Sequence, residues 1–316
     1  MLPEALKEGD KVAILSPASI IKPELVEGAV ITLREAGLRP EVMPHALGRS
    51  GSFSGTVAER LEDFRRALAD PEVKAVLCSR GGYGCVHLLE VLDGEMEKGR
   101  RLPWLIGFSD VSALHALWGS RGMVSVHASM AKQLAKGPED ALNAELLGLL
   151  RDPVSFKGTE WEAHPYNREG RAEGMVAGGN LAVVSELTGT PWDAIRPGEI
   201  LLIEDIAEPI YKVERILYRL KLSGVLPRLA GLVVGQFTDY RPSADYAAME
   251  DMVRDMVAPY AFPVAFNAPF GHVDGNRPVL LNQRTRLRSG RRAFPSFLYL
   301  TDFSLGFKRG TPRPYI

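Results

Sequence analysis

In the first half of this chain, short apolar runs alternate with segments of helical periodicity, and this alternation limits the possible folds more than any other feature. Apolar residues recur at helical spacing over 23–36, where Gly37 follows as a stop. Thr56 and Glu59 have the spacing of a capping box, which predicts the start of a second helix. Strands separated by helices of this length predict βαβ units and a parallel sheet. The predicted strands of this half are 11–15, 73–78, 104–108 and 123–127.

The alternating pattern breaks at 151–174, a polar stretch rich in turn-forming residues. We interpret this stretch as a linker between an N-terminal domain, 1–150, and a C-terminal domain, 175–316. The second half resumes the alternation. Its predicted elements are strands at 199–203, 231–235 and 263–267, helices at 211–222 and from a Ser243 cap through Met256, and a strand or hairpin at 278–287. The aromatic-rich end, 291–316, is a candidate dimer surface or domain edge.

The charge balance of the chain argues against nucleic acid or a membrane surface as its partner. Among 316 residues, Lys and Arg number 38 and Asp and Glu number 39, whereas proteins that bind those partners usually show a basic excess. No apolar run has the length of a membrane span, and the N-terminus lacks the profile of a signal peptide. With only two cysteines, Cys78 and Cys85, we expect a cytoplasmic protein without a disulfide framework.

Ser109 stands between a predicted buried strand and a predicted helix, in the sequence Gly-Phe-Ser-Asp at 107–110. Folds with parallel sheets place nucleophiles and ligand contacts at this kind of turn. A helix N-terminus also offers free N–H groups and a positive dipole end, both suited to an oxyanion. The alternative is that Ser109 is only a helix N-cap, a common role for serine.

Glu204 and His272 share the setting of Ser109, since each lies at or just past the end of a predicted apolar strand. A serine, a histidine and a carboxylate are the parts of an acyl-transfer triad, in which the imidazole takes the hydroxyl proton and the carboxylate orients the imidazole. His272 is otherwise an ordinary loop histidine, and Glu204 an ordinary charge at a helix start. The competing candidates are Asp205 and Glu208 for the acid and His115 and His127 for the base.

A glycine-rich turn, Arg-Gly-Gly-Tyr-Gly at 80–84, follows another predicted strand. Glycines allow close backbone approach and can aim N–H groups at an anion, although a plain tight turn is the alternative. The spacing is neither the dinucleotide fingerprint nor a P-loop, and the chain has no HExxH or Cys-x-x-Cys motif. We therefore expect no cofactor and no metal. Cys78 is interpreted as a buried strand residue and Cys85 as a minor candidate for reactivity at a helix start.

Taken together, these motifs resemble the LD-carboxypeptidase family of serine peptidases, which includes the microcin C immunity proteins. The matching segments are GDKVA at 9–13, SPAS at 16–19, RGGYG at 80–84, GFSD at 107–110, GGNL at 178–181, IEDIAE at 203–208 and GH at 271–272. The resemblance implies an α/β fold with an N-terminal flavodoxin-like parallel-sheet domain and a smaller C-terminal α/β domain of the swivelling type. It also implies a homodimer with the site between the domains.

The resemblance implies roles for individual residues. Ser109 would be the nucleophile, Glu204 the acid and His272 the base. The N–H groups of Gly82 and Asp110 would form the oxyanion hole, with Gly81 as the alternative to Gly82.

The activity implied is release of D-alanine from the L,D amide bond of murein tetrapeptides, during peptidoglycan recycling. The alternatives are hydrolysis of a peptidyl- or aminoacyl-nucleotide conjugate, with Trp161 or Trp192 stacking on the base, and a non-catalytic binding protein that uses the same cleft. Two segments depart from the family pattern. The chain has His-Ala-Ser at 127–129 where His-Gly-Pro is frequent, and it lacks the Pro-x-Gly segment that often follows Gly-His.

Overall fold

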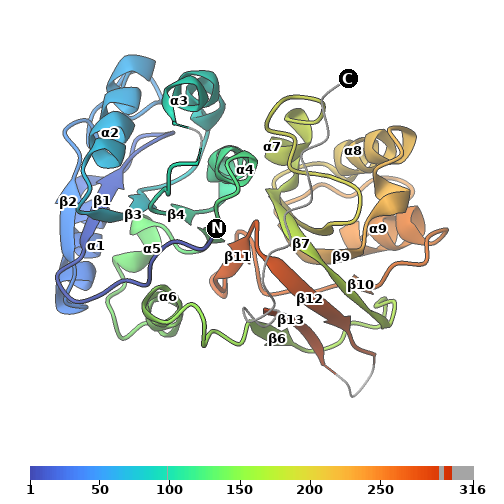
Figure 1. The fold of residues 1–316 in the computed structure, drawn as a ribbon. Coiled ribbons are helices and arrows are strands. Elements are labelled where there is room, and N and C mark those ends of the chain that lie inside the picture. The colour runs from blue at the N-terminus through green and yellow to red at the C-terminus, as the bar shows by residue number, and fades with distance from the viewer. Residues whose placement is uncertain (98, 292–294, 301–316) are drawn as a thin grey trace.

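A computed structural model describes residues 1–97, 99–291 and 295–300. The prediction for 291–316 falls largely outside these residues. Figure 1 shows two sheets side by side, each with its own helices. Among the described residues, no helix is both long enough and apolar enough to cross a membrane.

The first sheet has the flavodoxin-like strand order predicted from the family resemblance. Five parallel strands run in the order β2-β1-β3-β4-β5, and β11 adds an antiparallel edge beside β5. The strands are β1 Lys11–Leu15, β2 Arg39–Val42, β3 Val73–Cys78, β4 Trp104–Gly107, β5 Ser125–His127 and β11 Val279–Leu281.

Helices cover both faces of this sheet because successive strand residues point to opposite sides. One core contains Phe64 and Trp118 from α2 and α4, and the opposite core contains Leu33 and Leu146 from α1 and α6. The predicted capping box is confirmed, with Thr56 and Glu59 bonding reciprocally at the start of α2. The helical elements are α1 Pro23–Glu35, α2 Val57–Ala69, η1 Cys85–Leu88, α3 Leu89–Glu95, η2 Ser109–Val111, α4 Ser112–Ser120, α5 Ala131–Leu134 and α6 Ala141–Arg151.

The second sheet is parallel in one half and antiparallel in the other. Its order is β10-β9-β8-β7-β12-β13-β6, with parallel pairing from β10 to β7. Its strands are β6 Thr159–Trp161, β7 Gly170–Asn180, β8 Ile200–Ile206, β9 Gly231–Thr238, β10 Val264–Ala265, β12 Arg284–Ser289 and β13 Ser296–Leu300. The helical elements of this half are α7 Leu181–Glu186, α8 Ile210–Leu222, η3 Leu226–Arg228 and α9 Met249–Val257. At the seam between the sheets, α4 lies against α7 and β7 (Figure 1).

The structure corrects two predictions for the second half. Ser243 does not cap α9, which begins at Met249, because its hydroxyl instead accepts the N–H of Tyr246 in a local turn. The segment 278–287 is not a hairpin, since β11 joins the first sheet and β12 the second. Within 151–174, interpreted above as a linker, the structure has β6 and the first residues of β7.

Candidate active site

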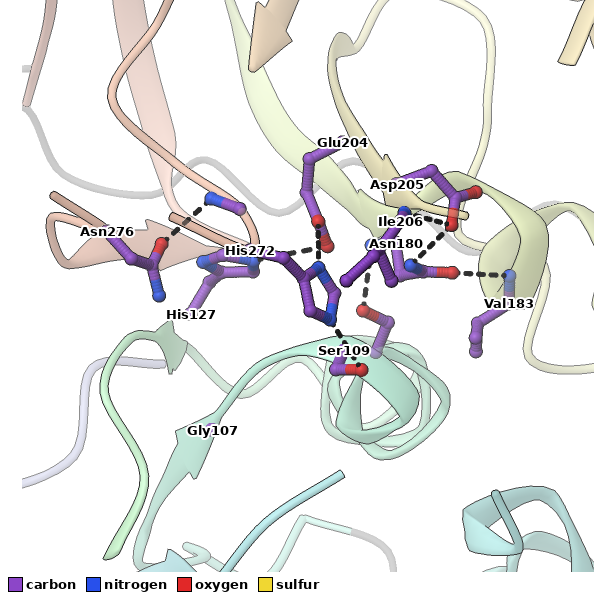
Figure 2. A network of polar contacts seen from close by, with 12 residues as sticks. Gly107, Ser109, His127, Asn180, Val183, Glu204, Asp205, Ile206, His272 and Asn276 are labelled. Carbon is purple, nitrogen blue, oxygen red and sulfur yellow. Dashed lines mark hydrogen bonds and ion pairs between the residues drawn. The ribbon is translucent and has the colours of Figure 1, made fainter. Parts of the chain in front are cut away.

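Ser109, Glu204 and His272 come from three separate elements and meet at the seam between the sheets (Figure 2). Ser109 follows β4, Glu204 lies on β8, and His272 lies in the loop after β10. His272 Nδ1 is 2.8 Å from Glu204 Oε2, and His272 Nε2 is 3.0 Å from Ser109 Oγ. In the neutral imidazole, Nδ1–H donates to the carboxylate and Nε2 accepts the serine O–H.

Ser109 adopts a backbone conformation that few residues other than glycine adopt. Its φ is 65°, directly after an extended Phe108, so the chain turns sharply between β4 and η2. No side-chain cap is formed at either η2 or α4, and the Ser109 hydroxyl points to His272 instead. A non-glycine residue in the left-handed region costs about 1–3 kcal/mol and persists only where its surroundings enforce it. The strained turn presents the hydroxyl at the carboxyl end of the sheet.

Two glycines make room for the Glu204–His272 pair. At Gly271, with φ at 122°, a Cβ would lie 3.0 Å from Glu204 Cβ and 3.1 Å from Glu204 Oε2. At Gly235, where β9 shifts register beside β8, a Cβ would lie 3.3 Å from Glu204 Cβ. The N–H of Gly271 donates to Asn276 Oδ1 at 2.9 Å, which fixes the loop that carries His272. The glycine of the Gly-His motif is therefore required by the space that Glu204 occupies.

Glu204 is fully buried, and two imidazoles lie against its carboxylate. Its Oε2 faces His272, while Oε1 lies 3.8 Å from Nε2 of His127, which is also fully buried. Burial raises the pKa of Glu204, but the interactions with His127 and His272 outweigh it and hold the pKa below its ordinary value. Glu204 is therefore an ionised carboxylate at neutral pH, as a group that orients and stabilises an imidazolium must be.

Asp205 and Glu208, the competing acids, make other contacts. Asp205 accepts the side-chain amide of Asn180 at 2.8 Å and the N–H of Ala182 at 2.8 Å, so its carboxylate holds the start of α7. Burial, followed by smaller effects that include the nearby Glu204 charge, raises the pKa of Asp205 to about 6. Glu208 forms an ion pair with Lys212 at 3.4 Å. Neither carboxylate contacts His272 among the described residues.

His115 and His127, the competing bases, do not contact Ser109 in the described structure. His115 is buried, with Nδ1 2.8 Å from Ser125 Oγ and Nε2 2.9 Å from the carbonyl of Gly107. Burial lowers the pKa of His115 to about 3, so it is a neutral structural residue. His127 instead faces the carboxylate of Glu204, at the oxygen that His272 does not contact (Figure 2).

The glycine-rich turn packs directly against the serine. A Cβ on Gly81 would lie 2.8 Å from Ser109 Cβ, 2.9 Å from Ser109 Oγ and 3.2 Å from the nitrogen of Asp110. Gly82, with φ at 122°, packs against Ser19 instead. Within the described residues, neither the N–H of Gly82 nor that of Asp110 donates a hydrogen bond. The two turns that carry these predicted oxyanion donors are therefore in contact, and their role as donors stays a prediction.

The side chain of Asp110 joins the two turns. Its Oδ2 accepts the N–H of Cys85 at 2.9 Å, just after the glycine turn. Cys78 and Cys85 are buried free thiols, and burial raises the pKa of both. The minor possibility that Cys85 is reactive is therefore not supported. In the described part of the chain, no three His, Cys, Asp or Glu side chains gather in a way that could hold a metal ion.

The seam is held by contacts that sequence reasoning did not assign. The N–H of Asn180 donates to Ser112 Oγ at 3.0 Å, linking the end of β7 to the start of α4. A Cβ on Gly179 would lie 2.5 Å from that hydroxyl. The GGNL motif contained two of these residues, but nothing in the sequence paired it with Ser112.

Comparison with known proteins gives the same family over both halves of the chain. Residues 12–128 match the model of the LD-carboxypeptidase N-terminal domain, and 173–287 match the model of the LD-carboxypeptidase C-terminal domain. The murein tetrapeptide carboxypeptidase of Pseudomonas aeruginosa is 33% identical over 275 residues, which cover 84% of this chain and 89% of that protein.

Solved structures share the fold over nearly the whole chain. The muramoyltetrapeptide carboxypeptidase from Oxalobacter formigenes has a TM-score of 0.78 at 27% identity, covering 92% of this chain and 100% of that one. The microcin C7 self immunity protein in complex with aspartyl sulfamoyl adenosine has a TM-score of 0.79 at 18% identity, covering 96% and 100%. At 18% identity this second likeness shows a common fold and no more.

Proposed function

The chain belongs to the LD-carboxypeptidase family, and from that premise we propose that it is a serine carboxypeptidase that releases D-alanine from the L,D amide bond of murein tetrapeptides. One observation carries the proposal. A single imidazole bridges a strained serine and a buried carboxylate, at 3.0 Å and 2.8 Å, across the seam between the two sheets. The names of two similar proteins agree with this proposal. The Pseudomonas protein is named a murein tetrapeptide carboxypeptidase, and the Oxalobacter structure is named a muramoyltetrapeptide carboxypeptidase.

In the proposed reaction, Ser109 Oγ attacks the carbonyl carbon while its proton moves to His272 Nε2. The carboxylate of Glu204 accepts Nδ1–H and stabilises the imidazolium. The oxyanion of the tetrahedral intermediate takes hydrogen bonds from the N–H groups of Gly82 and Asp110. The imidazolium then gives its proton to the leaving amine of D-alanine. Water, activated by the same imidazole, hydrolyses the acyl-serine and restores Ser109.

The alternative function, hydrolysis of a nucleotide conjugate, requires an aromatic side chain that stacks on the base, and one of the two candidates for that role is excluded. The ring of Trp161 is buried against Phe270, and its N–H donates to the carbonyl of Phe266 at 2.9 Å, so it is a core residue. Trp192 is half-buried against the core that contains Phe64 and Trp118. No observation on this chain favours the nucleotide conjugate over the murein peptide.

The test is hydrolysis by the purified protein of a tetrapeptide that ends in an L,D amide to D-alanine. We expect release of D-alanine, little release from the matched peptide ending in L-alanine, and loss of about 10³-fold or more in rate in Ser109→Ala. An aminoacyl-nucleotide amide is tested as the second substrate. If the protein hydrolyses this amide and not the tetrapeptide, the nucleotide conjugate replaces the murein peptide as the proposed substrate.

A serine-reactive fluorophosphonate tests the catalytic role independently of the substrate. We expect labelling of the wild-type protein and none of Ser109→Ala. If the folded wild-type protein neither reacts with the probe nor hydrolyses either substrate, the result would favour the alternative of a non-catalytic binding protein. The division into domains 1–150 and 175–316, the homodimer and the cytoplasmic location stay predictions.

A further inference from the structure

A second histidine lies against the carboxylate of Glu204, at the oxygen that His272 does not contact. His127 ends β5 and, like Glu204, is fully buried. Its Nε2 is 3.8 Å from Glu204 Oε1, an ion-pair distance that is too long for a hydrogen bond. Within the described residues, both nitrogens of His127 and the Oε1 atom of Glu204 are without a hydrogen-bond partner. Figure 2 shows both imidazoles next to this carboxylate.

Buried polar atoms in native proteins are nearly always hydrogen-bonded, so unpartnered atoms that face one another call for an explanation. A movement of about 1 Å would bring His127 Nε2 and Glu204 Oε1 to an ordinary N–H···O distance. The ring of Phe108 packs against both imidazoles, with centroids 5.6 Å from His127 and 5.0 Å from His272. The two imidazoles thus share an aromatic neighbour, and each carboxylate oxygen faces a nitrogen of one imidazole.

We propose that His127 is a positioning residue, whose Nε2–H donates to Glu204 Oε1 and holds the carboxylate ionised and aimed at His272. This inference rests on the proposed role of Glu204. His127 does not touch the reacting atoms, because the contact with Ser109 is made by His272. It acts through Glu204, by fixing one oxygen so that the other stays opposite Nδ1 of His272.

The surroundings set the direction of the expected pH effect. The titratable groups that interact with this pair are His272 from the loop after β10, Asp205 on β8 and His115 on α4. Two imidazoles oppose burial in setting the pKa of Glu204, so removal of His127 should raise that pKa. The inactive, protonated form of Glu204 would then persist to higher pH. The acid limb of the kcat profile should therefore move upward.

The test compares His127→Leu, which keeps apolar bulk but has no donor, with His127→Gln, which keeps a neutral N–H donor. We expect His127→Leu to lower kcat by about tenfold or more with KM within about twofold, and to move the acid limb to higher pH. His127→Gln should recover kcat to within about threefold of wild type. His45→Leu is the matched control, because His45 also faces a carboxylate, Glu62, at 3.2 Å but lies outside the site.

NMR of ¹⁵N-histidine-labelled protein gives a readout independent of turnover. Wild type should show imidazole N–H protons shifted downfield by Glu204 from both His127 and His272, one lost in His127→Gln and the other in His272→Gln. Any such proton from His45, which faces Glu62, is recognised by its loss in His45→Leu. Absence of the His127 proton, or an unmoved acid limb in a folded His127→Leu, would overturn the proposal. Both protons without hydrolysis of any substrate would support the contact between His127 and Glu204 and refute the proposed function instead.

Discussion

Replacing Glu204 by glutamine should cost much of the turnover, whereas the matching change at Asp205 should not. Glu204 and Asp205 are adjacent, buried carboxylates on β8, but only Glu204 faces His272. In Glu204→Gln the imidazolium formed during catalysis loses a charge about 4 Å from its centre, worth about 4 kcal/mol at an effective dielectric constant near 20. A retained N–H···O bond to the amide oxygen returns about 1 kcal/mol. The remainder, about 3 kcal/mol, corresponds to a loss of about 10²-fold in kcat.

Asp205→Asn should leave kcat within about threefold, because the side chain of Asp205 binds Asn180 and Ala182 rather than the imidazole. Its free energy of unfolding at pH 7 should stay within about 2 kcal/mol of wild type, because two effects oppose each other. One backbone N–H at α7 loses its acceptor, whereas the neutral amide removes the cost of ionising a buried carboxyl whose pKa is raised to about 6. The assay is D-alanine release at saturating peptide, with the rate of fluorophosphonate labelling at Ser109 and urea unfolding measured in parallel. A silent Glu204→Gln beside a damaging Asp205→Asn would refute the reasoning and transfer the acid role to Asp205.

Three further changes test the site and its surroundings. Gly81→Ala should lower kcat by about 10²-fold, because the added Cβ would lie 2.8 Å from the Cβ of Ser109. Gly148→Ala is the control: no atom lies within 4 Å of the added Cβ, so this variant should be active and slightly more stable in thermal unfolding. Ser109→Gly should abolish hydrolysis yet raise the free energy of unfolding by about 1 kcal/mol, because glycine relieves the φ of 65°; a loss of stability would contradict the assigned strain. Burial raises the pKa of Glu199 from 4.5 to about 7, so its stabilising contribution is complete below about pH 4.5 and is lost as pH rises through 7. Glu199→Gln should therefore be neutral at pH 5 and stabilising by up to about 3 kcal/mol at pH 8 in denaturant titrations, and an equal effect at both pH values would count against this.

Features governed by local sequence were predicted well. The capping box at Thr56 and Glu59 depends on residues three apart, and the structure confirms it. The serine, the acid and the base could be proposed because each lies at or just past the end of a predicted strand, where folds with parallel sheets place their sites. That the serine and the acid come from different sheets could not be predicted in this way. The N-cap alternative for Ser109 could be dismissed only from the structure, because it depends on where the hydroxyl points.

Features that depend on distant pairing could not be predicted. The sequence of 278–287 predicts a strand or a hairpin, yet β11 and β12 pair with strands of different sheets, about which the local pattern carries no information. The same limit applies to His127. Its sequence position made it a competing base, and only the meeting of the two sheets brings its imidazole against Glu204 instead of Ser109.

The seam explains why the proposed triad demands so many small residues far from the serine. Ser109 belongs to the first sheet, whereas Glu204 belongs to the second, so the 3.0 Å contact between His272 and the hydroxyl depends on how closely the sheets approach. Gly179 permits that approach, because any side chain there would meet the hydroxyl of Ser112. Catalytic geometry is sensitive to displacements of about 1 Å, so a single added methyl group at the seam would separate base from nucleophile without touching either. The glycines of the GGNL and Gly-His motifs thus act as spacers that set the distance across which a proton moves.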